Sequence, residues 1–171
     1  NSVLHFAAAY GWLNICKLLI TAGADTNAKN DWKYNPLSVA FLKGFTNISD
    51  YFLDLPSVDI NDKDGEGRTL LHIILSSKND NTLKMATLLV VEKNASTEVV
   101  DSSGHTLFHL LAKSPHKEDL ALAELLFNSG APINTATTDG VRPLDSAVTS
   151  GNITIFRFLL ENNAEIVVPK E

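Results

Sequence analysis

The sequence predicts an all-α fold, an α-solenoid in which short helix-turn-helix repeats follow one another along the chain. The first observation is a four-residue segment that occurs five times: Ser2-Val3-Leu4-His5, Asn35-Pro36-Leu37-Ser38, Thr69-Leu70-Leu71-His72, Thr106-Leu107-Phe108-His109 and Arg142-Pro143-Leu144-Asp145. The third positions of these segments, at 4, 37, 71, 108 and 144, are separated by 33, 34, 37 and 36 residues. A nearly constant period of this size indicates stacked supersecondary units rather than one globular core.

The second observation is the helical periodicity within each repeat. In the first repeat, Leu4, Ala7 and Ala8 fall on one face of a short helix, which Gly11 is suited to end. A second apolar stripe with helical spacing follows: Ile15, Leu18 and Leu19. Each repeat is therefore expected to contain two helices, a tight turn between them and an extended loop.

Residues suited to helix ends support these boundaries. Asn35 is a favourable N-cap, and Pro36 and Pro143 fit the first helical position, where a missing N–H costs nothing. Gly23 follows the second helix of the first repeat, and Asn163 stands at the equivalent place in the fifth. Because asparagine also tolerates the left-handed conformation, Asn163 is expected to end its helix as Gly23 does.

Composition excludes several classes of function. The chain has 171 residues, 44% of them hydrophobic, and a net charge of -6. An acidic balance disfavours a nucleic-acid partner, and the apolar runs are too short for direct membrane insertion. Cys16 is the only cysteine and lies on a predicted helix, so we expect a small core residue, with a reactive thiol as the alternative, and a reducing compartment. The expected location is intracellular, in the cytoplasm or, alternatively, the nucleus.

The motif of the repeats resembles a known family. Residues 4–11 (Leu-His-Phe-Ala-Ala-Ala-Tyr-Gly) and 19–27 (Leu-Ile-Thr-Ala-Gly-Ala-Asp-Thr-Asn) closely resemble the ankyrin repeat, as do residues 67–72. The resemblance covers essentially the whole chain and implies a single array over residues 1–171. It implies a curved stack with β-hairpin finger loops, a concave face lined by the inner helices, and protein recognition rather than catalysis. The approximate repeats are 1–27, 28–61, 62–98, 99–134 and 135–168.

The array also departs from the family pattern. Repeats three and four lack the glycine between their helices and gain residues there, within 76–82 and 113–119. The last predicted helix carries Phe156, Phe158 and Leu160, and so lacks the polar outer face of a terminal capping repeat. We therefore expect this chain to be a segment of a longer protein.

Three of the five histidines occupy the same position of the repeated segment: His5, His72 and His109. A histidine at one repeat position favours a structural role, and the resemblance implies a hydrogen bond between neighbouring repeats. A metal-binding or catalytic role is the alternative, but the sequence contains no metal-ligand spacing and no nucleophile or phosphate-binding motif. We expect no enzymatic activity, no metal and no cofactor.

Aromatic residues are the strongest candidates for partner contact. Trp32 and Tyr34 lie on the second finger, at positions that do not build the stack. Large exposed aromatic side chains are typical of binding hot spots. The alternative for Trp32 is that it folds onto the neighbouring finger. Trp12 follows Gly11 in the turn between helices and is expected to cover the core on the side of the second helix.

The register of the repeats adds further candidates. These are Tyr10, Lys43, Lys113 and Thr149 at the ends of inner helices, and Arg68 and His105 at finger positions equivalent to Tyr34. Since Tyr10, Trp32 and Tyr34 crowd the first repeats, the strongest contacts are expected in the N-terminal half.

Carboxylates cluster around the third finger: Asp59, Asp62, Asp64 and Glu66. One interpretation is a solvated loop. The other is an acidic rim, with Glu66 in contact with the partner, that would attract a basic protein and accelerate its association.

The resemblance alone implies one modification. Ankyrin-type loops with leucine eight residues before an asparagine, and an acidic residue two before it, look like substrates of an asparaginyl hydroxylase. Asn27 and Asn61 fit this pattern, and Asn134 fits less well because Pro132 replaces the acid. The alternative is an unmodified asparagine that bonds its own turn.

The leading hypothesis is a non-catalytic protein–protein interaction module. As a monomer, it would present a concave groove and finger loops to a protein or peptide partner. The alternative is an architectural or autoregulatory spacer within a larger channel, enzyme or scaffold.

Overall fold

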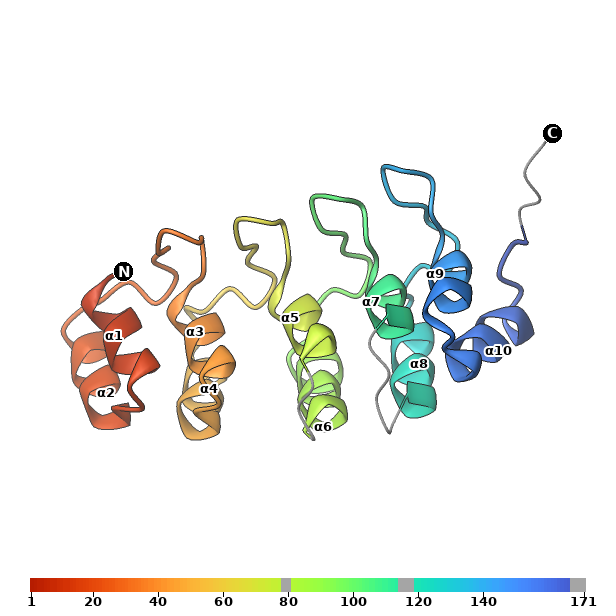
Figure 1. Cartoon of the computed structure of the whole chain (residues 1–171). Coiled ribbons are helices and arrows are strands. Elements are labelled where there is room, and N and C mark those ends of the chain that lie inside the picture. Colours follow the sequence, from red (N-terminus) through yellow and green to blue (C-terminus); the bar gives the residue numbers. More distant parts are fainter. Residues whose placement is uncertain (78–80, 114–118, 167–171) are drawn as a thin grey trace. The chain divides into compact units, whose positions relative to one another are not determined.

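The computed structural model describes residues 1–77, 81–113 and 119–166. These residues contain ten α-helices, one π-helical segment and no strand; one isolated β-bridge joins Val100 and Thr106 (Figure 1). The predicted all-α fold is confirmed. Much of the two predicted insertions, residues 78–80 and 114–118, lies outside the described residues. Contacts between Cα atoms divide the chain into two compact units, Asn1–Leu70 and Leu71–Glu171. The single array and its repeat boundaries stay predictions.

The first compact unit contains two helical pairs. They are α1 (Val3–Ala9) with α2 (Leu13–Thr21), and α3 (Pro36–Leu42) with α4 (Thr46–Leu53). Helix α1 packs against α2 and α3, and α4 packs against α2 and α3. Small residues allow the close approach of α1 and α3, because Ala8 and Ala40 are fully buried, as are the larger side chains Leu4 and Leu37 of the same helices.

The second compact unit repeats this pattern. Its helices are α5 (Leu70–Ser76), which begins one residue before the boundary, α6 (Thr82–Thr87), η1 (Leu88–Glu92), α7 (Leu107–Lys113), α8 (Asp119–Asn128), α9 (Pro143–Ser150) and α10 (Ile153–Glu161). Helix α7 packs against α8 and α9, and α10 packs against α8 and α9. The π-helical segment η1 continues α6 with a wider turn, which the sequence pattern did not predict.

Helix ends form where capping chemistry predicts them. The Asn35 side chain accepts a hydrogen bond from the backbone N–H of Ser38 at 2.9 Å, and Pro36 is the first residue of α3. Gly23 and Asn163 both have positive φ, 88° and 64°, after α2 and α10. The predicted equivalence of these two residues is confirmed.

The apolar stripe of α2 is less buried than predicted. Ile15 is 42% and Leu18 70% exposed, whereas the equivalent residues of α10, Ile155 and Phe158, are 0% and 6% exposed. The cause is the neighbouring helix. Helix α10 packs against α8, and the ring of Phe158 contacts that of Phe127 with centroids 5.9 Å apart. Helix α2 packs against α1 and α4, which leaves these positions open.

Candidate partner-binding groove

Four finger loops share one hairpin-like turn. In each, the backbone N–H of the first residue donates to the carbonyl of the fifth: Asn30 to Tyr34 at 3.0 Å, Asp64 to Arg68 at 2.9 Å, Asp101 to His105 at 3.1 Å, and Thr137 to Val141 at 2.8 Å. We call residues 30–34, 64–68, 101–105 and 137–141 the second, third, fourth and fifth fingers. Because the turn is closed at its base, the backbone at its tip and at its fifth position is held in one conformation.

The first side chain of the finger stabilises this turn. Asn30 Oδ1 accepts hydrogen bonds from the backbone N–H groups of Trp32 and Tyr34, both at 3.0 Å. Asp64 Oδ1 does the same for Glu66 and Arg68, both at 2.9 Å. The second finger also bonds to the third, since the Gly65 N–H donates to the Trp32 carbonyl at 3.1 Å. These contacts hold the backbone around Trp32.

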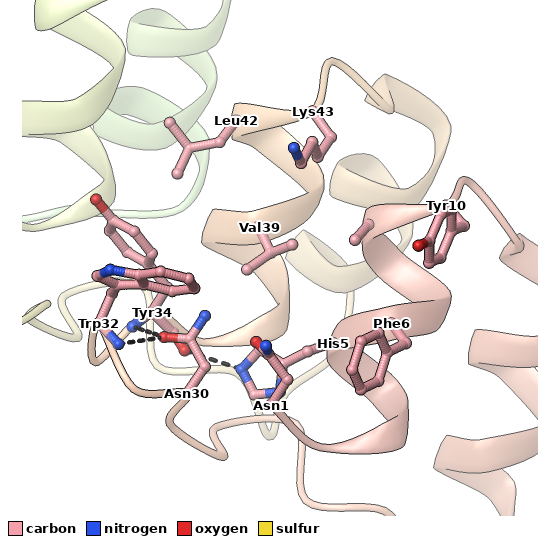
Figure 2. A pocket seen from close by; sticks show the side chains of 11 residues that line it. Asn1, His5, Phe6, Tyr10, Asn30, Trp32, Tyr34, Val39, Leu42 and Lys43 are labelled. Carbon is pink, nitrogen blue, oxygen red and sulfur yellow. Dashed lines mark hydrogen bonds between the residues drawn. The ribbon is translucent and has the colours of Figure 1, made fainter.

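Within the first compact unit, the second finger, α1 and α3 border an open groove of about 590 Å³ (Figure 2). We call it the α1–α3 groove. Its lining residues are Asn1, His5, Phe6, Ala9, Tyr10, Asn30, Trp32, Tyr34, Val39, Leu42 and Lys43. Four residues that the sequence selected for partner contact, Tyr10, Trp32, Tyr34 and Lys43, are therefore brought to one site.

The aromatic side chains of the groove are open to solvent. Trp32 is 66% exposed, so its side chain does not fold onto the neighbouring finger. Tyr10 is 62% exposed and stacks on Trp12, with ring centroids 5.1 Å apart and planes at 24°. The prediction that Trp12 covers the core is wrong. The tight turn at Gly11, where φ is 79°, brings positions 10 and 12 side by side, and Trp12 stays 51% exposed.

Sequence reasoning missed the apolar lining between these aromatic residues: Phe6, Ala9, Val39 and Leu42. Phe6 and Leu42 are 49% and 48% exposed, which is unusual for large apolar side chains on packed helices. The sequence did contain a signal for these residues, because they occupy equivalent positions of neighbouring repeats. Phe6 and Val39, Ala9 and Leu42, and Tyr10 and Lys43 are each 33 residues apart. Phe6 also lies one helical turn before Tyr10.

His5 forms part of the groove and holds the second finger. Its Nε2–H donates to the Tyr34 carbonyl at 2.9 Å, while Nδ1 accepts from the Ser2 backbone N–H at 3.1 Å and faces the Ser2 hydroxyl at 2.8 Å. His109 repeats this arrangement with Val141 and Thr106. The predicted hydrogen bond between neighbouring repeats is thus present at both histidines. Burial is the main cause that lowers the pKa of both rings, so both are neutral at pH 7.

Arg68 positions Tyr34 rather than offering a free charge. Its Nη2 donates to the Tyr34 hydroxyl at 2.8 Å, and its Nε and Nη1 pair with Asp64 and Glu66, both at 2.9 Å. Burial acts against the charged form, but hydrogen bonding and charge attraction from Asp64 outweigh it and raise the pKa of Arg68. A further predicted rim residue, Asp62, pairs with Lys29 and accepts from Asn35 at 2.9 Å. The carboxylates of the predicted acidic rim are therefore largely engaged within the chain.

The remaining predicted contact residues, His105 and Lys113, lie side by side in the second compact unit. Lys113 Nζ donates to His105 Nε2 at 2.9 Å, and His105 Nδ1 donates to Asp101 Oδ2 at 3.1 Å. Burial works to raise the pKa of Asp101, but hydrogen bonds from the backbone and ring of His105 lower it below its usual value. This arrangement orients His105 at the base of the fourth finger.

The two asparagines predicted as modification sites differ in their surroundings. The Asn27 amide bridges to the next repeat, because Nδ2 donates to the Ser57 carbonyl at 2.5 Å and Oδ1 accepts from the Asp59 N–H at 2.9 Å. Asn61 is exposed, and its backbone N–H donates to Asp59 Oδ1 at 2.9 Å. Both lie in loops that are open to solvent at least in part.

The described residues hold neither a metal-ligand cluster nor a membrane-spanning helix. Over residues 1–77, 81–113 and 119–166, no group of three or more histidine, cysteine or acidic side chains is placed to hold a metal ion. In the same part of the chain, no helix combines the length and the apolar character needed to cross a bilayer.

Paired short helices joined by capped turns and closed fingers define a helical repeat protein. The profile of the family described as ankyrin repeats (3 copies) matches residues 4–99 and again residues 73–170. The chain therefore belongs to the ankyrin-repeat family. This fold is a non-catalytic interaction fold that generally mediates protein–protein contacts.

Individual relatives come from much longer proteins. The chain is 35% identical over 192 residues to poly [ADP-ribose] polymerase tankyrase of Caenorhabditis elegans, covering 96% of this chain but 8% of that protein. It is 26% identical over 165 residues to palmitoyltransferase AKR1 of Lachancea kluyveri, covering 96% of this chain and 22% of the relative. The chain is also 34% identical over 70 residues to alpha-latrotoxin-Lh1a of Latrodectus hasselti, a shorter match that covers 40% of this chain and 5% of that protein.

Proposed function

We propose that this chain is a non-catalytic interaction module that holds a peptide segment of a partner protein in the α1–α3 groove. The observation that carries the proposal is the exposed apolar and aromatic lining of this groove. Trp32, Tyr10, Phe6 and Leu42 each leave about half or more of their surface in water. Apolar surface of this kind gains free energy when a partner covers it.

The groove is also pre-organised for binding. The second finger is held by Asn30 from within, by Gly65 from the third finger and by His5 from α1. Arg68 fixes the hydroxyl of Tyr34. Because these groups are ordered before the partner arrives, binding loses less conformational entropy than it would on a mobile loop. Tryptophan and tyrosine are also the residue types that most often dominate interface energies.

Other predicted contact residues take secondary roles in this proposal. Arg68 supports Tyr34 from the third finger and is itself paired with Glu66, while His105 and Lys113 in the second compact unit stay predicted contact residues outside this groove. A basic partner, predicted from the acidic rim, finds little support, because Asp62, Asp64 and Glu66 are already paired. An intracellular location, cytoplasmic or nuclear, fits the buried lone thiol of Cys16.

The direct test is selection from a library of random 12-residue peptides displayed on phage. We expect enriched peptides to lose at least about tenfold in affinity for a Trp32→Ala variant, as is usual for a hot-spot tryptophan. The matched control is Leu18→Ala, which removes an equally exposed apolar side chain of α2 outside the groove. Thermal melts establish that both variants are folded. Equal loss in both variants, or in neither, would contradict the proposal.

An architectural role within a larger protein is the second candidate. It is favoured by the relatives, of which this chain covers 8% and 22%. In that case the groove would be covered by a segment of the same polypeptide. A longer natural chain would then protect Trp32 from oxidation or quenching, and would bind the selected peptides more weakly than the 171-residue chain does. Equal affinity in both forms would contradict this candidate.

We also propose that Asn27 and Asn61 are sites of asparaginyl hydroxylation. The proposal rests on the family resemblance and on the accessible loops that carry both residues. Peptide mass spectra of native material should show one added oxygen on either residue. Fully unmodified peptides covering both positions would contradict this proposal.

A further inference from the structure

Two hydrogen-bond donors of the α1–α3 groove have no acceptor within the described part of the chain. One is the ammonium group of Lys43, which lines the groove from the end of α3 and forms no ion pair among these residues. The other is the side-chain amide nitrogen of Asn30, whose residue is only 5% exposed. Figure 2 shows the Asn30 amide and Lys43 with Val39 between them. Lys43 is exposed, and the Asn30 nitrogen reaches solvent at the surface of the groove, so both donors are available to an acceptor that a ligand supplies.

The orientation of the Asn30 amide follows from its contacts. Its oxygen must face the backbone N–H groups of Trp32 and Tyr34, because both of these groups can only donate. The nitrogen, with its two N–H bonds, therefore points away from the finger backbone and toward the groove (Figure 2).

The groove lacks negative charge. None of its lining residues is an aspartate or glutamate. The ring of His5 is neutral and its Nδ1 is occupied by Ser2, and the hydroxyl of Tyr34 already accepts from Arg68. Asp31 lies at the tip of the second finger and does not line the groove. The charge of the lining side chains therefore comes from Lys43, within an otherwise aromatic and aliphatic surface.

We propose that the occupant of the α1–α3 groove is an acidic-apolar peptide, in which an aspartate or glutamate side chain stands within a few residues of a large apolar side chain. The carboxylate would pair with Lys43, the Asn30 amide would donate to another acceptor of the same peptide, and the apolar side chain would pack on Trp32, Phe6 and Leu42. Charge complementarity selects this occupant, because a basic peptide would leave Lys43 without an ion-pair partner and would be repelled by it. This inference rests on the proposed function and names the class of partner.

The same phage selection tests this inference through the composition of the enriched peptides. We expect aspartate or glutamate beside a large apolar residue, and a synthetic peptide from this set should bind Lys43→Glu about three to ten times more weakly. The control is Lys17→Glu, which changes the net charge equally on α2, where Lys17 lies over the ring of Tyr51. Replacing the peptide carboxylate by lysine should restore affinity for Lys43→Glu.

Asn30→Asp provides a second test without loss of the turn. Aspartate occupies the equivalent position in the third and fourth fingers, where it accepts the same backbone hydrogen bonds. This variant keeps the acceptor of the turn and replaces the donor that faces the groove. We therefore expect it to bind the acidic peptide more weakly and to remain folded, as judged by circular dichroism.

The outcomes separate this inference from the proposed function. Peptides that depend on Trp32 but lack acidic residues, and that bind Lys43→Glu as tightly as the wild-type chain, would overturn the inference and leave the groove function standing. Peptides that bind Trp32→Ala unchanged, or a library that yields no enriched peptide, would overturn both. Loss of affinity in Lys17→Glu equal to that in Lys43→Glu would also overturn the inference, since it would indicate long-range charge only.

Discussion

At the residue scale, the second finger differs from the others at one backbone position. Lys33 has φ of 63°, whereas the equivalent residues of the third, fourth and fifth fingers are Gly67, Gly104 and Gly140, with φ between 74° and 81°. A side chain in the left-handed region is strained by contact with its own backbone. The finger that borders the groove therefore carries a conformational cost that its neighbours avoid.

We predict that Lys33→Gly stabilises the protein by about 0.5–1 kcal/mol, which is the relief of this strain less the extra entropy of glycine in the unfolded chain. Chemical denaturation measures the difference. Gly140→Lys is the reverse change in the fifth finger, where nothing lies within 4 Å of a Cβ atom, and should destabilise by a similar amount. A less stable Lys33→Gly variant would contradict the strain assigned to Lys33.

The buried histidines predict a dependence of stability on pH. The pKa values of His5 and His109 are lowered in the folded state, mainly by burial, from an ordinary value near 6.5. The unfolded chain therefore binds protons first as the pH falls. Stability is complete above about pH 6.5 and declines between that value and the lower folded pKa.

We expect the melting temperature to fall between pH 7.5 and pH 5.5, and to fall less in a His5→Gln, His109→Gln variant, which has neither titrating ring. Glutamine keeps an N–H donor for the carbonyls of Tyr34 and Val141. The quantity compared is the change in melting temperature over this interval, not its absolute value. An equal fall in both proteins would mean that these rings do not cause the loss.

At the element scale, the turn between α1 and α2 depends on a close contact with the next repeat. Gly11 has φ of 79°, and a Cβ atom there would lie 2.5 Å from the ring of Phe45, the residue before α4. The glycine thus serves both the left-handed turn and the packing of one helical pair on the other. The turn also places Trp12 against Tyr10 at the edge of the groove.

Gly11→Ala should therefore destabilise the protein by at least about 2 kcal/mol, from backbone strain and steric overlap together. Gly44→Ala is the matched control, because φ is 77° there but no atom lies within 4 Å of the added methyl group. Denaturation of both variants separates strain from overlap. Equal destabilisation would show that the contact with Phe45 adds nothing.

The same elements show what the sequence could and could not predict. Helix ends at Asn35 and Asn163 were predictable because a cap depends on local chemistry. The exposure of Ile15 and Leu18 was not, since burial depends on which helix packs beside them. Tyr10, Trp32, Tyr34 and Lys43 could be selected from repeat register, but the donors left unpaired at Asn30 and Lys43 become visible only with the hydrogen bonds of the finger.

At the scale of the whole molecule, the candidate groove lies entirely within the first compact unit, Asn1–Leu70. The second compact unit has its own core around α7, α8, α9 and α10. In repeat proteins, stability is distributed over neighbouring repeats, so a site and a distant core can be perturbed separately. We therefore expect that a mutation in the core of the second compact unit can lower the stability of the protein without changing the affinity of the groove for a peptide.

We predict that Phe108→Ala, in the core of the second compact unit, lowers stability by about 3–5 kcal/mol. Phe108 is fully buried and stacks with Phe158, with ring centroids 6.1 Å apart. Below the melting temperature of the variant, the affinity for a peptide selected on the wild-type chain should stay within about twofold. A large loss of affinity in this folded variant would place part of the binding site in the second compact unit.

The most direct test of the groove itself is a map of amide and indole NMR signals on titration with one selected peptide. The chain has two tryptophans, so their indole N–H signals report separately on Trp32, which lines the groove, and on Trp12, which stacks on the groove residue Tyr10. We predict the largest shifts at the Trp32 indole and at backbone amides of residues 5–10 and 30–43. Shifts confined to residues 119–166, with both indole signals unchanged, would contradict the assignment of the α1–α3 groove as the binding site.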